Sequence, residues 1–137
     1  MGKQSDIVAK LKKVDRFADL RSSDLKAVAE AGTLLHLPAQ WALMSETTPA
    51  DKAYVILSGE VAIRQGGKDV ATVGAGGIIG EVGILEKKLR SASVVSLTEL
   101  EVVHFTNADL ARLVDESDGI ERVLRATAQE HLAAGYE

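Results

Sequence analysis

The sequence contains no cysteine and only two prolines, and aromatic residues make up 4% of its 137 residues. The absence of cysteine excludes disulfide bonds and thiolate metal sites, and it fits a reducing compartment. With so few aromatic residues, the core must be built from Val, Leu, Ile and Ala, which is feasible because 46% of the chain is hydrophobic. A chain of this length suggests one domain that buries a real core.

Positive charge is also scarce, because 16 Lys and Arg stand against 20 Asp and Glu, for a net charge of −4. No basic stripe is visible of the kind that nucleic-acid-binding surfaces carry. The N-terminus lacks the apolar core of a signal peptide, and no stretch approaches membrane-spanning length without a charge. We therefore expect a soluble, cytoplasmic protein that binds no membrane and, by this chain alone, no nucleic acid.

Hydrophobic periodicity divides the chain into a helical segment at 1–32, a strand-rich segment at 33–105 and a second helical segment at 107–134. Short apolar runs separated by frequent turn residues are typical of an antiparallel barrel or jelly roll. The predicted fold is therefore α+β. We expect a single domain over residues 1–137, in which N-terminal and C-terminal helices flank an antiparallel β-barrel.

Local signals predict how some of these elements turn and end. Ser58-Gly59 and Gly66-Gly67 are each expected to form the turn of a hairpin. In the N-terminal segment, Ser22 or Ser23 is expected to cap a helix that ends at Gly32.

Five glycines fall between residues 74 and 83, where a strand is expected to give way to a short helix. Glycine allows positive φ and lets a ligand approach the backbone closely, although barrel corners need glycine as well. If a helical turn begins at Gly80-Glu81, the backbone N–H groups of Val82 and Gly83 point out of its N-terminus. They then offer an anion site.

Two charged side chains flank this turn. The neighbours of Glu81 are all apolar or glycine, so its carboxylate needs a donor, and ribose hydroxyls are good donors for such a group. Arg90 presents a planar fork that suits phosphate oxygens, and Ser91 and Ala92 follow it with a hydroxyl and backbone N–H groups. Taken singly, Glu81 is explained by the helix dipole and Arg90 by an ion pair or by solvent. The combination favours a ligand site.

The run GEVGILEKKLRSASV at residues 80–94 resembles the phosphate-binding cassette of cyclic nucleotide-binding domains, the type found in catabolite activator protein and protein kinase A regulatory subunits. We take the whole cassette as residues 76–94. The similarity continues upstream in AYVILSGEVAI, in LPAQWALMSETTPAD and in the leading helices. The family often has glycine where Gln40 stands and again near Thr47, and it usually has proline in place of Leu89.

The resemblance implies a role for each cassette residue. Glu81 would accept a hydrogen bond from the ribose 2′-hydroxyl, and Arg90 would bind the cyclic phosphate. The remaining contacts would be backbone groups and further donors to the phosphate, supplied by Gly80, Val82, Gly83, Ser91 and Ala92.

The purine also needs contacts, and in this family the C-terminal helix often provides a lid. Thr127 and His131 are the polar members of an otherwise apolar stripe on that helix, so either is a candidate base contact. An alternative for His131 is a place near a frayed C-terminus. Val73 and Ile79 are candidate apolar walls for the base. Trp41, the only tryptophan, is expected to pack in the core.

The apolar stripe itself must be buried against something. We expect a helix that becomes ordered when nucleotide binds, and a homodimer through this helix is an open alternative. The members of the stripe are Ile120, Val123, Leu124, Ala128 and Leu132.

Three functions fit these features to different degrees. The first is a regulatory sensor that binds a 3′,5′-cyclic nucleotide, with cAMP favoured over cGMP, and that is not an enzyme and needs no cofactor. The second is an interaction module with the same fold and no ligand; retention of both Glu81 and Arg90 argues against it. The third is a small metal enzyme of the cupin type, which needs clustered histidines. His36, His104 and His131 are dispersed, so no metal site is expected.

Overall fold

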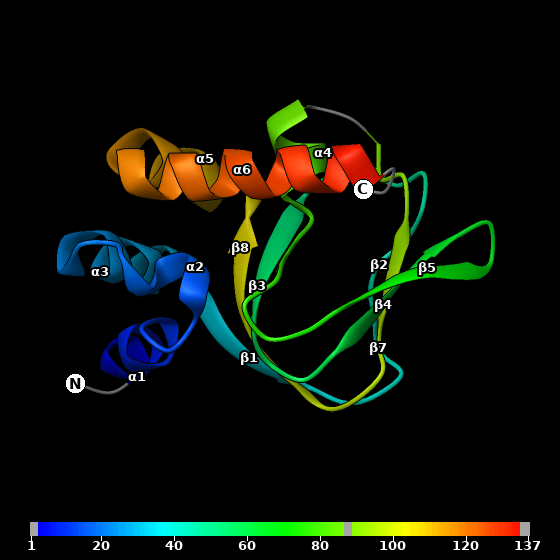
Figure 1. Cartoon of the computed structure of the whole chain (residues 1–137), viewed down its shortest axis with the longest axis horizontal. Coiled ribbons are helices and arrows are strands. Elements are labelled where there is room, and N and C mark those ends of the chain that lie inside the picture. The colour runs from blue at the N-terminus through cyan, green and yellow to red at the C-terminus, as the bar shows by residue number, and fades with distance from the viewer. Residues whose placement is uncertain (1–2, 87–88, 135–137) are drawn as a thin grey trace.

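The computed structural model describes residues 3–86 and 89–134, and it shows two β-sheets with helices before and after them (Figure 1). The helices are α1 (Lys3–Leu11), α2 (Asp15–Ala18), α3 (Ser22–Ala31), α4 (Glu81–Glu86), α5 (Asn107–Glu116) and α6 (Asp118–Ala134). The strands are β1 (Thr33–Leu37), β2 (Ala42–Met44), β3 (Lys52–Ser58), β4 (Val61–Gln65), β5 (Lys68–Val73), β6 (Ile78–Ile79), β7 (Ser93–Ser96) and β8 (Leu100–Thr106).

The strands form two four-stranded antiparallel sheets that face each other as a jelly-roll-like sandwich, so the predicted fold class is confirmed. One sheet has the order β1-β8-β3-β6 and the other β2-β7-β4-β5. The Gly66-Gly67 turn joins β4 to β5 as a hairpin, as predicted. The hairpin predicted at Ser58-Gly59 is wrong, because β3 pairs with β6 and β8 while β4 belongs to the other sheet. The turn carries the chain from one sheet to the other.

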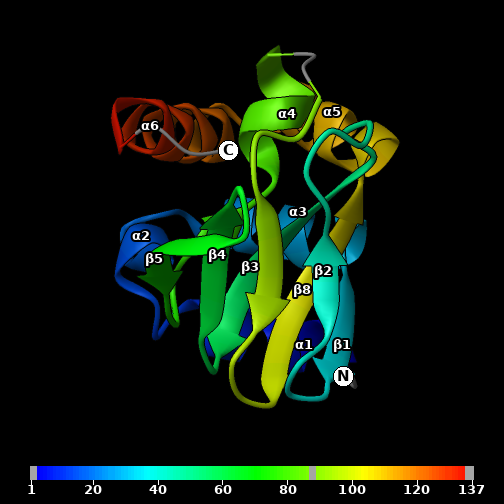
Figure 2. The same ribbon diagram turned by 90° about the vertical axis from the view of Figure 1, so that its right-hand side faces the viewer.

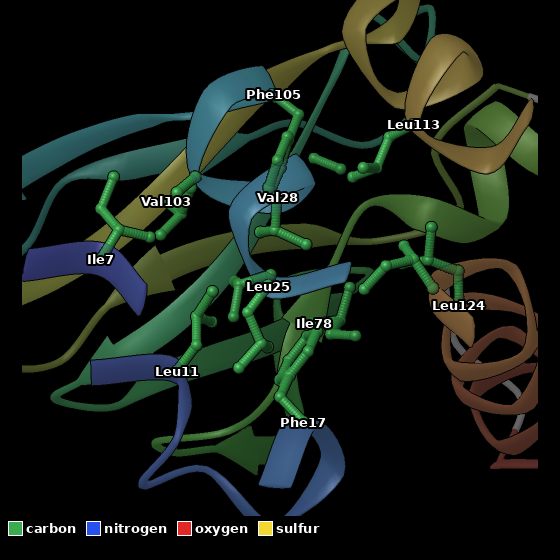
Figure 3. Close-up of a cluster of buried hydrophobic side chains, with 14 of the residues drawn as sticks. Ile7, Leu11, Phe17, Leu25, Val28, Ile78, Val103, Phe105, Leu113 and Leu124 are labelled. Carbon is green, nitrogen blue, oxygen red and sulfur yellow. The ribbon is translucent and has the colours of Figure 1, made fainter. Parts of the chain in front are cut away.

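Strand β3 shows why its sequence is a continuous apolar run. Ala53 and Val55 face a cluster formed with the helices, whereas Tyr54 and Ile56 face the space between the two sheets. A strand buried on both faces has no polar side to alternate with. Figure 3 shows the helix-facing cluster, in which Phe17 and Leu25 lie near Ile78 and Ile7 lies near Val103.

Helix α6 crosses one end of the sandwich, beside α4 and α5 (Figures 1 and 2). Its first turn is fixed to α3 by a buried relay, in which Ser117 Oγ donates to Asp24 Oδ1 (2.7 Å) and accepts from the Ile120 N–H (3.1 Å). Asp24 Oδ2 also accepts from the Arg21 backbone N–H (3.3 Å). Arg21 is therefore the N-cap of α3, and the predicted cap at Ser22 or Ser23 is wrong. This helix end is held by the hydrogen bond that the Asp24 carboxylate accepts from the Arg21 N–H.

One expectation about an apolar side chain is also wrong. Trp41 lies at the edge of the second sheet and is 50% exposed, held by its backbone N–H, which donates to Ser96 Oγ. Leu132 is 41% exposed, whereas Ile120, Leu124 and Ala128 of the same stripe are buried within this chain. The homodimer through α6 stays a prediction. Among the described residues, no helix combines the length and apolarity that crossing a bilayer requires.

Gln40 and Thr47 are the two non-glycine residues described with positive φ, at 62° and 63°. Gln40 stands where the resembling family often has glycine, and Thr47 lies near a second such position. The structure keeps the left-handed turn in spite of the side chains. Such a conformation costs roughly 1–2 kcal/mol for a residue with a Cβ, and the cost is highest for a β-branched residue such as threonine.

We therefore expect Thr47→Gly to raise the free energy of unfolding by about 0.5–1 kcal/mol, after the entropy that glycine adds to the unfolded chain is subtracted. Gln40→Gly is expected to give a smaller gain in the same direction. Urea denaturation of each variant measures the change. Thr47→Ala is the matched control, because it removes the hydroxyl that donates to the Glu46 carbonyl yet keeps the strained φ. Equal stabilities of the Gly and Ala variants would contradict the argument.

Candidate ligand-binding site

Gly80 sets the geometry of the site. Its φ is 93°, and a Cβ there would lie 2.8 Å from the Lys52 carbonyl oxygen and 3.2 Å from Arg90 Nη1. Glycine is thus required both by the backbone conformation and by the close approach of its neighbours. The turn at Gly80 ends β6 and places Glu81 as the first residue of α4, with Val82 and Gly83 following in the same helix.

Arg90 is brought to this turn from the far end of the cassette. Its side chain is buried, with 5% of the residue exposed, and Nη1 donates to the Gly80 carbonyl at 2.7 Å. Nη2 donates to the carbonyl of Lys52 at the start of β3. The backbone of Arg90 is held as well, since its N–H donates to Thr48 O and its carbonyl accepts from Thr47 N–H. The guanidinium is therefore fixed beside Gly80 by two neutral carbonyl oxygens.

Glu81 is fully buried, at 0% exposure, and it meets α6. Its Oε2 lies 3.1 Å from Nδ1 of His131, which is itself 6% exposed. An ionised carboxylate buried this deeply needs hydrogen-bonded or charged neighbours to remain charged. The contact with His131 is one such interaction, and it ties the first turn of α4 to the last turns of α6.

The loop after Arg90 is tied to the β4–β5 hairpin. Ser91 is exposed, and its carbonyl accepts from Gln65 Nε2 at 3.1 Å. Glu46 completes this connection, because its carboxylate accepts from the Gly66 N–H and its backbone N–H donates to Ser93 Oγ. Ala92 is buried between the sheets. The hairpin and the cassette therefore hold each other in place.

A cavity of about 720 Å³ lies between the N-terminal helices, the β5–β6 corner and α6. Its volume falls within the roughly 300–1,000 Å³ range of small-molecule sites. Val73, Thr127 and His131 are on its wall, whereas Glu81 and Arg90 are not. The corner is tightly built, because a Cβ at Gly77 would lie 2.1 Å from Val73 Cγ1. His131 thus both lines the cavity and contacts the Glu81 carboxylate.

Two ion pairs lie on the wall of this cavity. Arg16 on α2 donates to both carboxylate oxygens of Glu130, at 2.6 and 3.2 Å, and to Thr127 Oγ1. The hydrogen bond from Arg16 lowers the pKa of Glu130 and reciprocally raises that of Arg16. In the second pair, the hydrogen bond between Lys10 and Glu101 raises the pKa of Lys10 and lowers that of Glu101. All four side chains therefore carry their charges across the neutral range.

The model of the cyclic nucleotide-binding domain family matches residues 34–117, which is more than half of the chain. The chain belongs to the cyclic nucleotide-binding domain family. Among curated proteins, it is 31% identical over 106 residues to a cAMP-dependent protein kinase regulatory subunit of Yarrowia lipolytica, covering 76% of this chain and 28% of that protein. It is also 31% identical over 96 residues to an uncharacterized NTE family protein of Mycobacterium bovis, covering 69% of this chain and 16% of that protein. The chain thus spans less than a third of these relatives.

Solved structures show the same fold. PKAR CBD2 with Sp-2Cl-cAMPS bound superposes with a TM-score of 0.83 at 19% identity, covering 96% of this chain and 88% of that chain. The regulatory domain of Toxoplasma gondii PKA with cAMP has a TM-score of 0.78 at 18% identity, covering 93% of this chain and 49% of that chain. At these identities the likeness concerns the fold alone.

Of the cassette residues predicted for this cyclic nucleotide-binding domain, Gly80, Glu81 and Arg90 lie together at one turn, with the Arg90 guanidinium beside Gly80. Ser91 is exposed and Ala92 is buried between the sheets. The four candidate base contacts are not gathered in the same way. Val73 and Thr127 line the cavity, but Ile79 is fully buried between the sheets. His131 does line the cavity, yet its nearest described polar contact is the Glu81 carboxylate. The ligand roles of all these residues stay predictions.

Sequence reasoning missed several groups that position the site of this cyclic nucleotide-binding domain. The carbonyl of Lys52 holds Arg90, and a backbone acceptor gives no signal in a sequence. Arg16 joins α2 to α6, and its partner is 114 residues away along the chain. Within residues 3–86 and 89–134, no cluster of three or more His, Asp or Glu side chains is arranged to hold a metal ion.

Proposed function

We propose that this chain is a regulatory sensor that binds a 3′,5′-cyclic nucleotide, with cAMP preferred to cGMP, without hydrolysing it. The observation that carries the proposal is the convergence of Arg90 and Glu81 on the Gly80 turn. Relatives named as cAMP-dependent protein kinase regulatory subunits support it, as do similar folds solved with cAMP or a cAMP analogue. We further propose that α6 transmits the binding event to an output segment or partner.

The chemistry of the two charged groups suits the two ends of the ribose-phosphate unit. A cyclic phosphate carries one negative charge, which the fixed Arg90 guanidinium can bind through its planar set of donors. The ribose 2′-hydroxyl can donate to the Glu81 carboxylate, whose ionised form only accepts hydrogen bonds. A guanidinium cation and a carboxylate acceptor can bind the phosphate and the ribose without activating a water for hydrolysis.

Calorimetric titration of cAMP and of cGMP into the purified chain tests the proposal. We expect saturable binding of both nucleotides with a lower Kd for cAMP, and we expect the nucleotide to be recovered unchanged. No heat and no thermal shift at millimolar concentrations of either nucleotide would favour the second candidate, the interaction module without a ligand. A lower Kd for cGMP than for cAMP would contradict only the proposed preference for cAMP, and the proposed binding of a cyclic nucleotide would stand.

Glu81 is expected to discriminate at the ribose. A ligand without the 2′-hydroxyl leaves the buried carboxylate short of one donor, at a cost of about 1–3 kcal/mol, or about 5–150-fold in affinity. We therefore expect 2′-deoxy-cAMP to bind more weakly than cAMP by that factor. The same pair of titrations with Glu81→Gln is the control, in which the gap is expected to shrink. Equal affinity of the unmodified protein for the two ligands would remove Glu81 from the ribose site.

Helix α6 is expected to change its dynamics on binding, because a ligand shifts a conformation only through differential contacts with two states. Hydrogen exchange over residues 117–134, with and without cAMP, measures this change. Residues 22–31 of α3 serve as an internal reference, because α3 holds the anchored start of α6 through Asp24 and is not expected to move with the far end of that helix. Identical protection of α6 in both conditions would mean that the helix is a fixed part of the fold.

A further inference from the structure

His131 separates the large cavity from the buried carboxylate of Glu81. Its ring lines the cavity, and its Nδ1 lies 3.1 Å from Glu81 Oε2. Glu81 has no solvent-accessible surface in this arrangement. A ribose hydroxyl must approach a carboxylate oxygen to about 2.7 Å to donate to it. Nucleotide therefore cannot contact Glu81 until the end of α6 that carries His131 moves.

We propose that His131 is a proton-sensitive latch that competes with the nucleotide for Glu81, so that nucleotide binding breaks the latch and strengthens as the pH rises. The inference rests on the proposed function and adds to it how the same site is regulated. In this view His131 is a positioning residue, which acts on the ligand through Glu81.

The fold lets one end of α6 move while the other stays in place. The start of the helix is anchored through Ser117 to Asp24 of α3, and both of these residues are buried. His131 lies 14 residues further along the helix, a rise of about 21 Å at 1.5 Å per residue. A small tilt about the anchored end therefore displaces His131 by several times more than it displaces Ser117. Besides the latch, Arg16 of α2 donates to Thr127 Oγ1 and Glu130 in this part of α6, where Thr127 and Ala128 are buried. The half-exposed Arg16–Glu130 pair contributes little by itself.

Charged groups face the surroundings of His131 from several neighbouring elements. Glu81 comes from α4, and Glu130 is its neighbour in α6. The cavity wall adds charged residues from α1, α2 and β8, namely Lys10, Lys13, Asp15, Arg16 and Glu101. The ion pairs Lys10–Glu101 and Arg16–Glu130 raise the pKa of each base and lower that of each acid, so these four stay charged between about pH 5.5 and 8.5. A histidine is the side chain that ordinarily titrates in this range.

The sign of the pH effect follows from the contact. The imidazolium form of His131 makes an ion pair with the Glu81 carboxylate at 3.1 Å, whereas the neutral imidazole has no net charge for the carboxylate to attract. The latched arrangement therefore binds the proton more tightly than the open, nucleotide-bound arrangement does. Nucleotide binding then releases a proton, and by linkage the affinity rises with pH through the titration of His131.

Titration calorimetry of cAMP into the full chain at about pH 5.5, 6.5, 7.5 and 8.5 tests the latch. We expect the Kd to fall by about tenfold from pH 5.5 to 7.5, the factor that corresponds to one pKa unit of differential interaction. Repeating the titration in two buffers with different ionisation enthalpies should show proton release near pH 6. His131→Asn keeps a neutral donor near the Nδ1 position, and it is expected to bind about tenfold more tightly than the unmodified protein at pH 5.5 and to show a flat pH profile.

His36→Gln is the matched control, because His36 also contacts a carboxylate, that of Glu101, but on the exposed surface of β1 and β8. It is expected to keep the pH profile of the unmodified protein. Three results would overturn the latch while leaving the proposed function standing. They are a cAMP affinity that does not depend on pH, an affinity that falls as the pH rises, and weaker binding by His131→Asn than by the unmodified protein at pH 5.5. Absence of binding at every pH overturns the proposed function itself, and the latch with it. His131→Ala, compared by circular dichroism and by cAMP titration, gives a second variant should the asparagine variant fail to fold.

Discussion

Arg90→Ala is expected to lower the affinity for cAMP by about 2–4 kcal/mol, which is about 30-fold to about 1,000-fold. The substitution removes the buried cation that the structure places beside the Gly80 turn, where the proposal puts the phosphate. The phosphate charge would then be left without its partner at a site shielded from water, where such a loss costs most. Titration calorimetry against the unmodified protein measures the change.

The guanidinium also has a structural role that this experiment must separate from binding. It joins the carbonyl of Gly80 to the carbonyl of Lys52 at the start of β3. We therefore expect a lower melting temperature in Arg90→Ala, and the binding constant should be taken only where the variant is folded by circular dichroism.

Arg90→Lys serves as the charge-matched comparison. Lysine keeps the positive charge, but its single ammonium lacks the planar fork that reaches two carbonyls and a phosphate together. It is expected to recover only part of the lost affinity. If the Arg90→Lys variant bound cAMP as tightly as the unmodified protein, charge alone would explain the site and the bidentate argument would fail.

The outline of the fold could be predicted from the sequence because the helical periods at both ends, the short apolar runs between them and the turn residues all indicate the same architecture. The short strand runs predicted the sandwich, and Gly66-Gly67 predicted its hairpin correctly. Ser58-Gly59 has the same local turn chemistry, yet it joins two sheets. A two-residue turn signal reports only that the chain reverses. Which strands then pair is decided by long-range contacts, here those of β8 with β3 and of β7 with β4.

Burial was harder to predict than secondary structure. Tryptophan is a large apolar residue, and with one in the chain a core position was the natural expectation. Trp41 is exposed because β2 is a three-residue edge strand, and the space between the sheets is already filled by side chains such as Leu43 and Ile63. Leu132 is exposed near the end of α6, beyond the part of the helix that packs on the core.

The cassette was predictable because its residues are close in sequence, and the structure places the Arg90 guanidinium against Gly80, as a shared site requires. The partner of Glu81 could not be predicted in the same way. His131 is 50 residues further along, and its place on a stripe that also carries Thr127 suggested a contact with the purine. Only the packing of α6 on α4 shows that the imidazole meets the carboxylate. A polar residue on an apolar helix face thus indicates a specific partner without identifying it.

Asp24→Ala is expected to lower the free energy of unfolding by about 1–3 kcal/mol, the cost of leaving a buried hydroxyl without its acceptor. The Asp24 carboxylate accepts from Ser117 Oγ, which in turn accepts from the Ile120 N–H and so caps the first turn of α6. Asp24→Asn retains an acceptor of similar shape and should lose less. Urea denaturation at pH 7 measures both variants. A double-mutant cycle with Ser117→Ala should then show a coupling energy between the two positions.

The same carboxylate makes the stability dependent on pH in a defined direction. The hydrogen bond from Ser117, aided by Arg21, lowers the pKa of Asp24 in the folded protein. A carboxyl group whose folded pKa lies below its unfolded value of about 3.9 stabilises the fold above that value, and the stabilisation is lost as the pH falls through the folded pKa. The stability gap between the unmodified protein and Asp24→Asn should therefore be constant from pH 7 to about pH 5 and should narrow below about pH 4. A gap that widened on acidification would mean that Asp24 is protonated in the folded protein, and that the anchor of α6 is a neutral hydrogen bond.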